Sequence, residues 1–199
     1  MESSTIFMSA IIVLLAYLIG SVPFALVIGK GFYKTDVRKH GSGNLGATNT
    51  FRALGKKAGI IVMVGDMAKG SLATCLPLIL DSNLHMLIPG FIAILGHSYP
   101  VFAKFKGGKS VATTAGVFLA FSPLAFILGI LAFLISLKIS KYVSLSSSIG
   151  ALVALLTSIY VGDKVLIVFA AIICAFIAFK HIENFKRIIK GVEPKVTWL

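Results

Sequence analysis

The chain has little charge and very few cysteines. Only 13% of its 199 residues are charged, and 57% are hydrophobic. A soluble domain averages about 25% charged residues, so this composition excludes an ordinary soluble protein and indicates an integral membrane protein. The two cysteines, Cys75 and Cys174, lie inside apolar stretches without C-x-x-C spacing. We therefore expect free thiols, and no metal site is predicted.

Long apolar stretches follow one another along almost the whole chain, and a membrane-spanning helix needs about 20 apolar residues. The stretches are 6–28, 58–80, 86–103, 111–137, 142–161 and 165–180. The stretch 111–137 is too short for two full spans, but Ser122-Pro123 interrupts it, so we expect two short, tilted or partly re-entrant helices there. The sequence thus predicts an all-α, polytopic helical bundle with seven helical segments, five long and two short. A single membrane domain is expected over 1–199.

Positive charge is concentrated in a few connections. In a soluble protein the net charge of +12 would suggest nucleic acid, but here the positive-inside rule accounts for it, and no nucleic-acid partner is expected. Lys and Arg number seven in 30–57, three in 104–109, two in 138–141 and five in 180–195. We therefore expect the N-terminus outside and the C-terminus in the cytoplasm. Four polar clusters would then share the cytoplasmic face: 38–57, 104–110, 140–148 and 180–187.

The segment 41–52, Gly-Ser-Gly-Asn-Leu-Gly-Ala-Thr-Asn-Thr-Phe-Arg, combines glycines with small polar side chains and a cation. Glycine lets backbone N–H groups turn toward an anion, and arginine binds phosphate oxygens bidentately. A loop that only set topology would need the cations alone, so a phosphate site is favoured. The candidate residues are Gly41, Ser42, Gly43, Asn44, Thr48, Asn49 and Arg52.

A second glycine-rich loop, Lys104-Phe-Lys-Gly-Gly-Lys-Ser110, follows the stretch 86–103. Its Gly-Lys-Ser ending is similar to a P-loop, but that motif needs glycine at the position of Ala103, so a P-loop nucleoside triphosphatase is excluded. We expect an anion-binding nest at a helix N-terminus, formed by Gly107 and Gly108 with Lys109 as its central cation. The nearby His97 is expected to be a packed, hydrogen-bonded histidine.

Three weaker signals complete the polar set. His181 and Asn184 are three residues apart and would share one face of a helix. Ser144 begins a serine-rich stretch, and such serines are commonly caps or packing residues. Asp66 and Lys69 lie inside a predicted span, where ionisable residues are costly. They are either functional or a structural ion pair, and the second interpretation is favoured.

At these motifs the chain resembles the bacterial acyl-phosphate-dependent glycerol-3-phosphate acyltransferase family of small integral membrane enzymes. The matching stretches, in chain order, are 20–24, 41–49 with 52–56, 66–70, 96–102 with 105–109, and 181–184. Ser110 departs from the family, because many members have glycine there.

The resemblance implies transfer of a fatty acyl group from acyl phosphate to the 1-hydroxyl of sn-glycerol 3-phosphate. The products would be 1-acylglycerol 3-phosphate (lysophosphatidic acid) and phosphate, in the first acylation step of phospholipid synthesis. The cytoplasmic side of the bacterial inner membrane would be the location, with membrane lipid around the enzyme. Because acyl phosphate is already activated, no metal, nucleotide or other cofactor is expected.

The resemblance also assigns roles to individual residues. Catalytic roles fall on Ser42, Arg52, Lys109, His181 and Asn184. Phosphate or substrate contacts fall on Gly107, Gly108 and Ser144, and structural support falls on Glu183. His181 and the phosphate of the donor remain alternative acceptors for the hydroxyl proton.

Two other classes remain alternatives: a transporter of organic phosphates, and a scaffold whose loops bind anionic lipid. The expected gathering of polar residues on one face, rather than at the midplane, argues against transport. Thioester-dependent acyltransferases with a His-x-x-x-x-Asp motif are excluded. The residues five beyond the four histidines are Leu45, Gly90, Phe102 and Lys186. The oligomeric state stays open, a monomer included.

Overall fold

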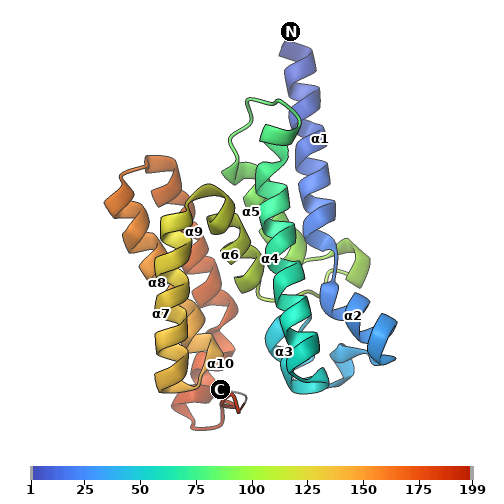
Figure 1. Cartoon of the computed structure of the whole chain (residues 1–199), viewed down its shortest axis with the longest axis vertical. Helices are drawn as coiled ribbons and strands as arrows, with labels where there is room; N and C mark the ends of the chain where they lie inside the picture. Colours follow the sequence, from blue (N-terminus) through green and yellow to red (C-terminus); the bar gives the residue numbers. More distant parts are fainter. Residues whose placement is uncertain (1, 198–199) are drawn as a thin grey trace. The chain divides into compact units, whose positions relative to one another are not determined.

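The computed structural model describes residues 2–197, with side chains from Thr5 onward. Between those residues the chain forms ten α-helices and two short 3₁₀ helices, and no strand (Figure 1). Helices satisfy their own backbone hydrogen bonds, which a chain in the bilayer core requires. The predicted all-α class is confirmed. The expected orientation of the two ends stays a prediction, and positions 1 and 198–199 lie outside the described residues.

The chain divides into two compact units, Met1–Phe121 and Ser122–Leu199. The first contains α1 (Glu2–Ser21), α2 (Phe24–Tyr33), η1 (Val37–Lys39), α3 (Ala47–Leu54), α4 (Lys56–Ile79), α5 (Leu87–Ser98), η2 (Val101–Ala103) and α6 (Val111–Phe121). The second contains α7 (Pro123–Ser140), α8 (Val143–Val161), α9 (Lys164–Lys180) and α10 (Ile182–Ile189). That the whole chain acts as one domain stays a prediction.

Glycines allow close packing of the helices in the first unit. A Cβ added at Gly70 or Gly116 would run into the backbone of the facing helix, so α4 and α6 are in backbone contact there. Gly20 and Gly96 do the same for α1 and α5. Close approach through small residues is how helices associate in lipid, where burial of apolar area provides little driving force. These contacts hold α4 against α6, and α1 against α5.

The first predicted span, 6–28, is broken in two. Helix α1 ends at Ser21 and α2 begins at Phe24, with a bend of 43° between them (Figure 1). Pro23 at the break has no N–H to donate, which explains why the helix is interrupted there. A second bend, of 52°, separates α9 from α10. The helical segments are therefore divided more finely than the seven expected.

Two further length predictions need correction. The stretch 86–103 was expected to be a full span, but α5 has only 12 residues, because the chain turns at Tyr99-Pro100 into η2. The stretch 111–137 does break at Ser122-Pro123, but only α6, with 11 residues, is short. Helix α7 has 18 residues and is long enough to span. By length and composition the described chain has three spanning helices, or up to five if each bent pair counts as one.

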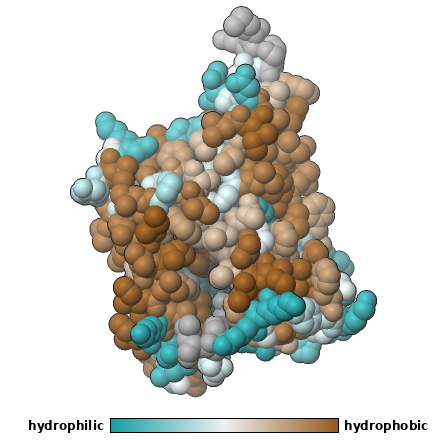
Figure 2. Space-filling model, in the orientation of Figure 1, coloured by the Kyte–Doolittle hydropathy of each residue, from teal (hydrophilic) through white to brown (hydrophobic). Residues whose placement is uncertain are grey.

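In the second unit α8 packs against both α7 and α9. Gly129 of α7 and Gly150 of α8 face each other, and a Cβ at Gly129 would lie 3.1 Å from the Gly150 carbonyl oxygen. Asp163 caps α9 by accepting hydrogen bonds from Val165 N and Leu166 N at 2.9 and 3.0 Å. Large apolar side chains remain exposed on this protein, and Figure 2 shows them covering most of one face. Exposed apolar surface of this extent is suited to contact with lipid.

Candidate active site

The first glycine-rich loop, in the first unit, is a tight turn centred on Ser42. Gly41 and Gly43 both have left-handed backbone conformations, with φ of +56° and +71°. Gly43 N donates to His40 O at 3.1 Å. The turn exposes Ser42, and the Asn44 side-chain amide donates to Ser42 Oγ at 3.3 Å. The glycines are required because a side chain at these φ values is strained.

The buried side chain of Asn49 stabilises this turn. Its Oδ1 accepts the Ser42 N–H at 2.9 Å, and its Nδ2 donates to Val37 O at 2.9 Å. The side chain is 2% exposed, and a Cβ at Gly41 would collide with its Oδ1. Asn49 was predicted to contact substrate. Its amide bonds within the loop on both sides, which supports a role in holding the loop, and its contact with substrate stays a prediction.

Arg52 and Thr48 lie one turn apart on α3, next to the Ser42 turn. A Cβ at Gly41 would come 4.0 Å from Arg52 Cβ, which brings the arginine to the same side of the loop. Helix α3 begins at Ala47 after Gly46, and no side chain caps its N-terminus. Backbone N–H groups at such an end are suited to an anion. The structure therefore groups Ser42, Thr48 and Arg52 around one turn.

The neighbouring Arg38 is held by Asp36. Its guanidinium donates to Asp36 through Nε at 2.9 Å and through the terminal nitrogen at 2.6 Å, and Lys30 Nζ lies 3.4 Å from the same carboxylate. These hydrogen bonds, with that of Arg38 first, hold the pKa of Asp36 well below its usual range. The pKa of Arg38 is raised by the same pair. Arg38 and Asp36 thus hold together the segment that leads into the Ser42 turn.

The second glycine-rich loop has an unusual backbone. Lys104, Phe105 and Ser110 all adopt left-handed conformations, with φ of 55°, 58° and 59°. Phe105 N donates to Pro100 O at 2.9 Å, and Gly108 N donates to His97 O at 3.2 Å. These bonds fold the loop back onto the end of α5.

Ser110, where the resemblance leads us to expect glycine, is buried in that loop. Its Oγ donates to Ile94 O at 2.9 Å and lies 2.7 Å from Ser98 Oγ. The Ser110 carbonyl accepts the N–H of Thr114 at 2.8 Å and so starts α6. The left-handed φ explains why glycine suits this position, and the hydroxyl hydrogen bonds offset the strain of serine.

Both loops rest on one apolar cluster of the first unit. Leu45 of the first loop is buried together with Val37 of η1 and Ala103 of η2, the short helices that precede the two loops. The other buried members come from α2 and α4: Ala25, Leu26 and Val62. Two cationic loops that are far apart in sequence are thus supported by the same small core.

Three buried ionisable side chains lie close to the second loop. Lys69 Nζ is 2.8 Å from Asp66 Oδ1, and His97 Nδ1 is 3.3 Å from the same oxygen. Asp66 is 1% exposed, Lys69 4% and His97 5%. Lys69 also donates to Val22 O at 2.7 Å, at the break between α1 and α2. The predicted partners Asp66 and Lys69 are paired, and His97 joins them.

In the second unit His181 lies at the bend between α9 and α10. It is 3% exposed, and its Nδ1 lies 2.8 Å from Ile177 O. Since a carbonyl oxygen only accepts, Nδ1 carries the hydrogen and Nε2 is the basic nitrogen of the neutral ring. The residue ends α9, and its carbonyl accepts the Asn184 N–H at 2.9 Å. His181 is the N-cap residue of α10 and Asn184 lies in the first turn of that helix, so the two are close in the chain at one helix start. Their shared role in a site stays a prediction.

The acidic residue that supports α10 is Glu193. It accepts hydrogen bonds from Asn184 Nδ2 at 2.6 Å and from Arg187 Nε at 2.7 Å, and its side chain is 4% exposed. Glu183, which was assigned structural support, has a side chain 71% exposed and pairs with Lys186. The supporting role of Glu183 stays a prediction. In the sequence, the one feature that could have indicated this role of Glu193 is its position as the last acidic residue in a basic C-terminal segment.

Ser144 lies in the first turn of α8 and is 2% exposed. Its Oγ is buried without a hydrogen-bond partner in the part of the chain that the structure describes. The following serines instead donate back to the helix: Ser146 to Tyr142 O, Ser147 to Val143 O and Ser148 to Ser144 O. Ser144 thus differs from its neighbours, although its part in a site stays a prediction.

The helical fold and the lipid-suited surface define an integral membrane protein, and its cationic glycine-rich loops are suited to an anionic ligand. A sequence model of the family "Glycerol-3-phosphate acyltransferase" matches residues 10–191. A glycerol-3-phosphate acyltransferase from Listeria monocytogenes is 56% identical over 94% of this chain and 96% of the relative. The chain belongs to the glycerol-3-phosphate acyltransferase family, and it is an acyltransferase.

Two solved structures are also similar to this chain. Both are crystal structures of PlsY (YgiH), an integral membrane glycerol 3-phosphate acyltransferase, in the glycerol 3-phosphate form and in the lysophosphatidic acid form. Their TM-scores are 0.88 and 0.85, with 38% identity, and each match covers 94% of this chain and 95% of the other. At this level of identity the likeness extends beyond the fold to the family.

Proposed function

We propose that this acyltransferase uses acyl phosphate as donor and the 1-hydroxyl of sn-glycerol 3-phosphate as acceptor. The carrying observation is that two cationic glycine-rich loops, around Ser42 and Lys109, share one supporting core in the first unit. Both substrates are phosphorylated, so each requires a site for a phosphate group. The glycerol 3-phosphate and lysophosphatidic acid forms of the related PlsY structures support this acceptor and product.

The proposed step is direct acyl transfer. The acceptor oxygen forms a bond to the acyl carbonyl carbon, the bond from that carbon to the phosphate oxygen breaks, and inorganic phosphate leaves. Negative charge develops on the carbonyl oxygen and on the departing phosphate. Preorganised cations and N–H groups stabilise such charge most strongly where water is excluded. Because the donor is activated, correct placement of the two substrates supplies much of the remaining rate.

Arg52 and Lys109 are the residues proposed to stabilise this charge. Arg52 presents a planar fork that suits two phosphate oxygens, and Lys109 acts as a point charge. Ser42 is proposed to hydrogen-bond a phosphate oxygen from the exposed turn. Gly41, Gly43, Gly107 and Gly108 let the backbone approach the phosphates.

The hydroxyl proton has two proposed acceptors. One is His181, whose Nε2 is the basic nitrogen, because Nδ1 faces Ile177 O. The other is the phosphate of the donor. Asn184 is proposed to assist by orientation, since Glu193 fixes its amide. A His181→Gln variant separates the two: loss of kcat by two orders of magnitude or more indicates a histidine base, and near-normal kcat indicates the phosphate.

Acyl transfer by the purified protein in lipid tests the donor. Labelled glycerol 3-phosphate is offered with palmitoyl phosphate or with palmitoyl-CoA, without added metal or nucleotide. Labelled lysophosphatidic acid from palmitoyl phosphate alone supports the proposal. Product from palmitoyl-CoA alone overturns the donor assignment, and no product from either overturns the proposed reaction.

Loop variants test the assigned cations. Lys109→Gln and Arg52→Lys are each expected to lower kcat/KM at least a hundredfold, since one loses the charge and the other loses bidentate geometry. The matched control for the first is Lys106→Gln, because Lys106 is exposed in the same loop. An equal loss in the control would show that net loop charge, rather than Lys109, is what matters.

A further inference from the structure

The buried group Asp66, Lys69 and His97 is linked to the loop that carries Lys109. A Cβ at Gly108 would collide with His97 Nε2, and a Cβ at Gly107 would collide with His97 O. The same carbonyl accepts the Gly108 N–H at 3.2 Å. Both glycines are therefore packed against one residue, through its ring and through its backbone.

The other side of the His97 ring is fixed by Asp66. Nδ1 lies 3.3 Å from Asp66 Oδ1, within ion-pair distance. This leaves Nε2 on the side of Gly108. A buried carboxylate beside one ring nitrogen favours one orientation of a histidine ring and so places its second nitrogen.

Asp66 is itself held in place by Lys69. The ammonium forms an ion pair with Asp66 and donates a hydrogen bond to Val22 O, so α4 is tied to the break between α1 and α2. Such a buried pair is weak evidence for stability, because desolvation offsets much of the attraction. We therefore attribute the burial of Asp66 to the side chain that its carboxylate orients, rather than to a gain in stability. The oriented group is His97.

We propose that His97 is a positioning residue for the phosphate-binding loop, acting through Gly108 on Lys109, with Asp66 fixing the ring. This rests on the proposed function of the loop. His97 touches no reacting atom in this role. It sets where the backbone of Gly107 and Gly108 lies, and Lys109 follows in the chain. A loop displaced from that place binds its phosphate poorly even though every ligand is present.

Two amide variants distinguish the contributions of the two ring nitrogens of His97. Asn places its amide nitrogen near the position of Nδ1, and Gln places it near Nε2. His97→Gln retains contact with Gly108, whereas His97→Asn retains the donor toward Asp66 and leaves a gap beneath the glycine. We expect His97→Asn and His97→Ala to lower kcat/KM at least tenfold, because a displaced Lys109 stabilises the transition state less well. His97→Gln is expected to restore most of the loss.

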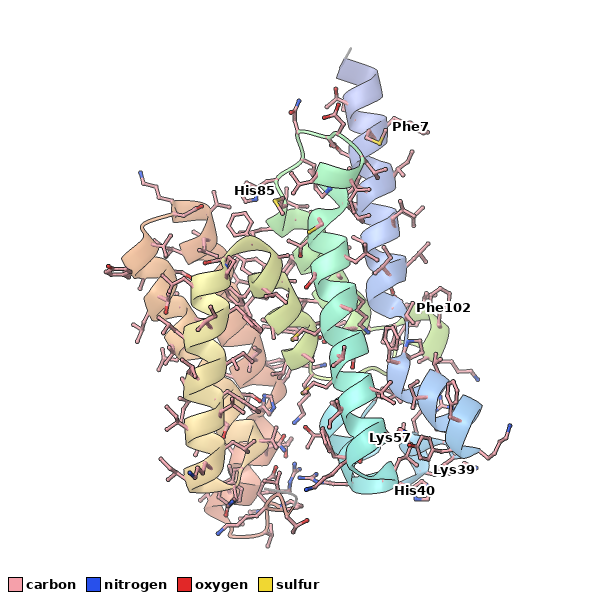
Figure 3. The ribbon with its side chains drawn as sticks, viewed as in Figure 1. Phe7, Lys39, His40, Lys57, His85 and Phe102 are labelled. Carbon is pink, nitrogen blue, oxygen red and sulfur yellow. The ribbon has the colours of Figure 1, made fainter. Side chains whose placement is uncertain are left out.

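A double-mutant cycle with Lys109→Gln distinguishes positioning from general support. If His97 acts through Lys109, His97→Ala lowers kcat/KM at least tenfold in the wild-type background, but less than threefold beside Lys109→Gln. Equal losses in both backgrounds overturn the proposal. Unchanged kinetics with a lowered melting temperature overturn it as well. The matched control is His85→Ala, in an exposed histidine of the same unit that lies at the end opposite Lys39 and Lys57 (Figure 3).

Trypsin cleavage after Lys106 and Lys109 provides a readout that needs no turnover. Faster cleavage in His97→Ala than in wild type or His85→Ala supports a displaced loop, and equal cleavage overturns it. The proposed function fails separately, if the wild-type protein yields no lysophosphatidic acid from palmitoyl phosphate. The two failures are therefore distinguishable.

Discussion

Asn49 and Ser42 are joined by a hydrogen bond in which Asn49 Oδ1 accepts the Ser42 N–H at 2.9 Å. The acceptor is buried and its nitrogen is bonded to Val37 O, so one side chain ties together η1, the Ser42 turn and α3. The exposed hydroxyl of Ser42 is thus presented by a turn that a buried amide holds. The proposed catalytic serine depends on a residue that faces away from solvent.

Replacing Asn49 with Ala is expected to destabilise the protein and disorder this turn. Ser42 N and Val37 O both lose their partner, and an orphaned buried polar group costs about 1–3 kcal/mol. Thermal unfolding in detergent measures the effect, with Asn44→Ala as control, because the Asn44 bond to Ser42 Oγ is long and exposed. Equal melting temperatures for wild type and Asn49→Ala would contradict the role.

Ser110 supports a comparison of two small substitutions. Ala keeps the cost of the left-handed φ and loses the hydroxyl bonds to Ile94 O and Ser98, whereas Gly loses the same bonds but relieves the strain. Ser110→Ala is therefore expected to be less stable than Ser110→Gly by about 1 kcal/mol. Denaturation of both variants in one detergent measures the difference. If Ala proves the more stable, the backbone argument is wrong.

Glu193 and Glu183 are a matched pair in the C-terminal segment. Glu193→Gln weakens charge-assisted bonds to Asn184 and Arg187, each worth about 1.5–3 kcal/mol at most, so a loss of about 2 kcal/mol is expected. Glu183→Gln removes an exposed pair with Lys186 and should change the stability little. Melting temperatures of both variants check this. A larger effect at Glu183 would instead support the structural role that the resemblance assigns to it.

How far the sequence could predict this fold is clear from its prolines. Hydropathy predicts helices, and Pro123 was recognised as a break because the basic segments 104–109 and 138–141 were both expected in the cytoplasm, so the stretch between them had to cross an even number of times. Pro23 gave the same chemical signal but lay in a stretch of ordinary span length, so the bend there was missed. The end of α5 at Ser98 was missed because Val101–Ala103 is apolar but turns into η2.

The candidate site divides in a similar way. Glycines beside cations identified both loops, because that chemistry is local. The supporting contacts were not local: Asn49 bonds Val37 O twelve residues away, and Asp66 meets His97 across two helices. Glu193 was missed for the same reason, since its burial depends on how the chain returns to α10. Sequence spacing cannot reveal such pairs until the helices are packed.

Asp36 predicts a small pH dependence of stability. The Arg38 hydrogen bonds lower its folded pKa, so the pair contributes stability that is present above the unfolded pKa of about 4 and is lost as pH falls through the folded value. Because the pair is partly exposed, the contribution is under about 1 kcal/mol. Asp36→Asn should lower the melting temperature at pH 7, and the difference should shrink below pH 4. A difference constant with pH would exclude this origin.

The two ends of the first unit are expected to face opposite sides of the membrane. Lys39, His40 and Lys57 gather at one end, and His85 lies at the other (Figure 3). Because positive loops stay in the cytoplasm, Lys39→Cys should react with a membrane-impermeant maleimide only after cells are permeabilised. His85→Cys should react in intact cells. The partly buried Cys75 and Cys174 set the background. Reaction of Lys39→Cys in intact cells would reverse the orientation and move the proposed phosphate loops outside, away from any cytoplasmic supply of acyl phosphate.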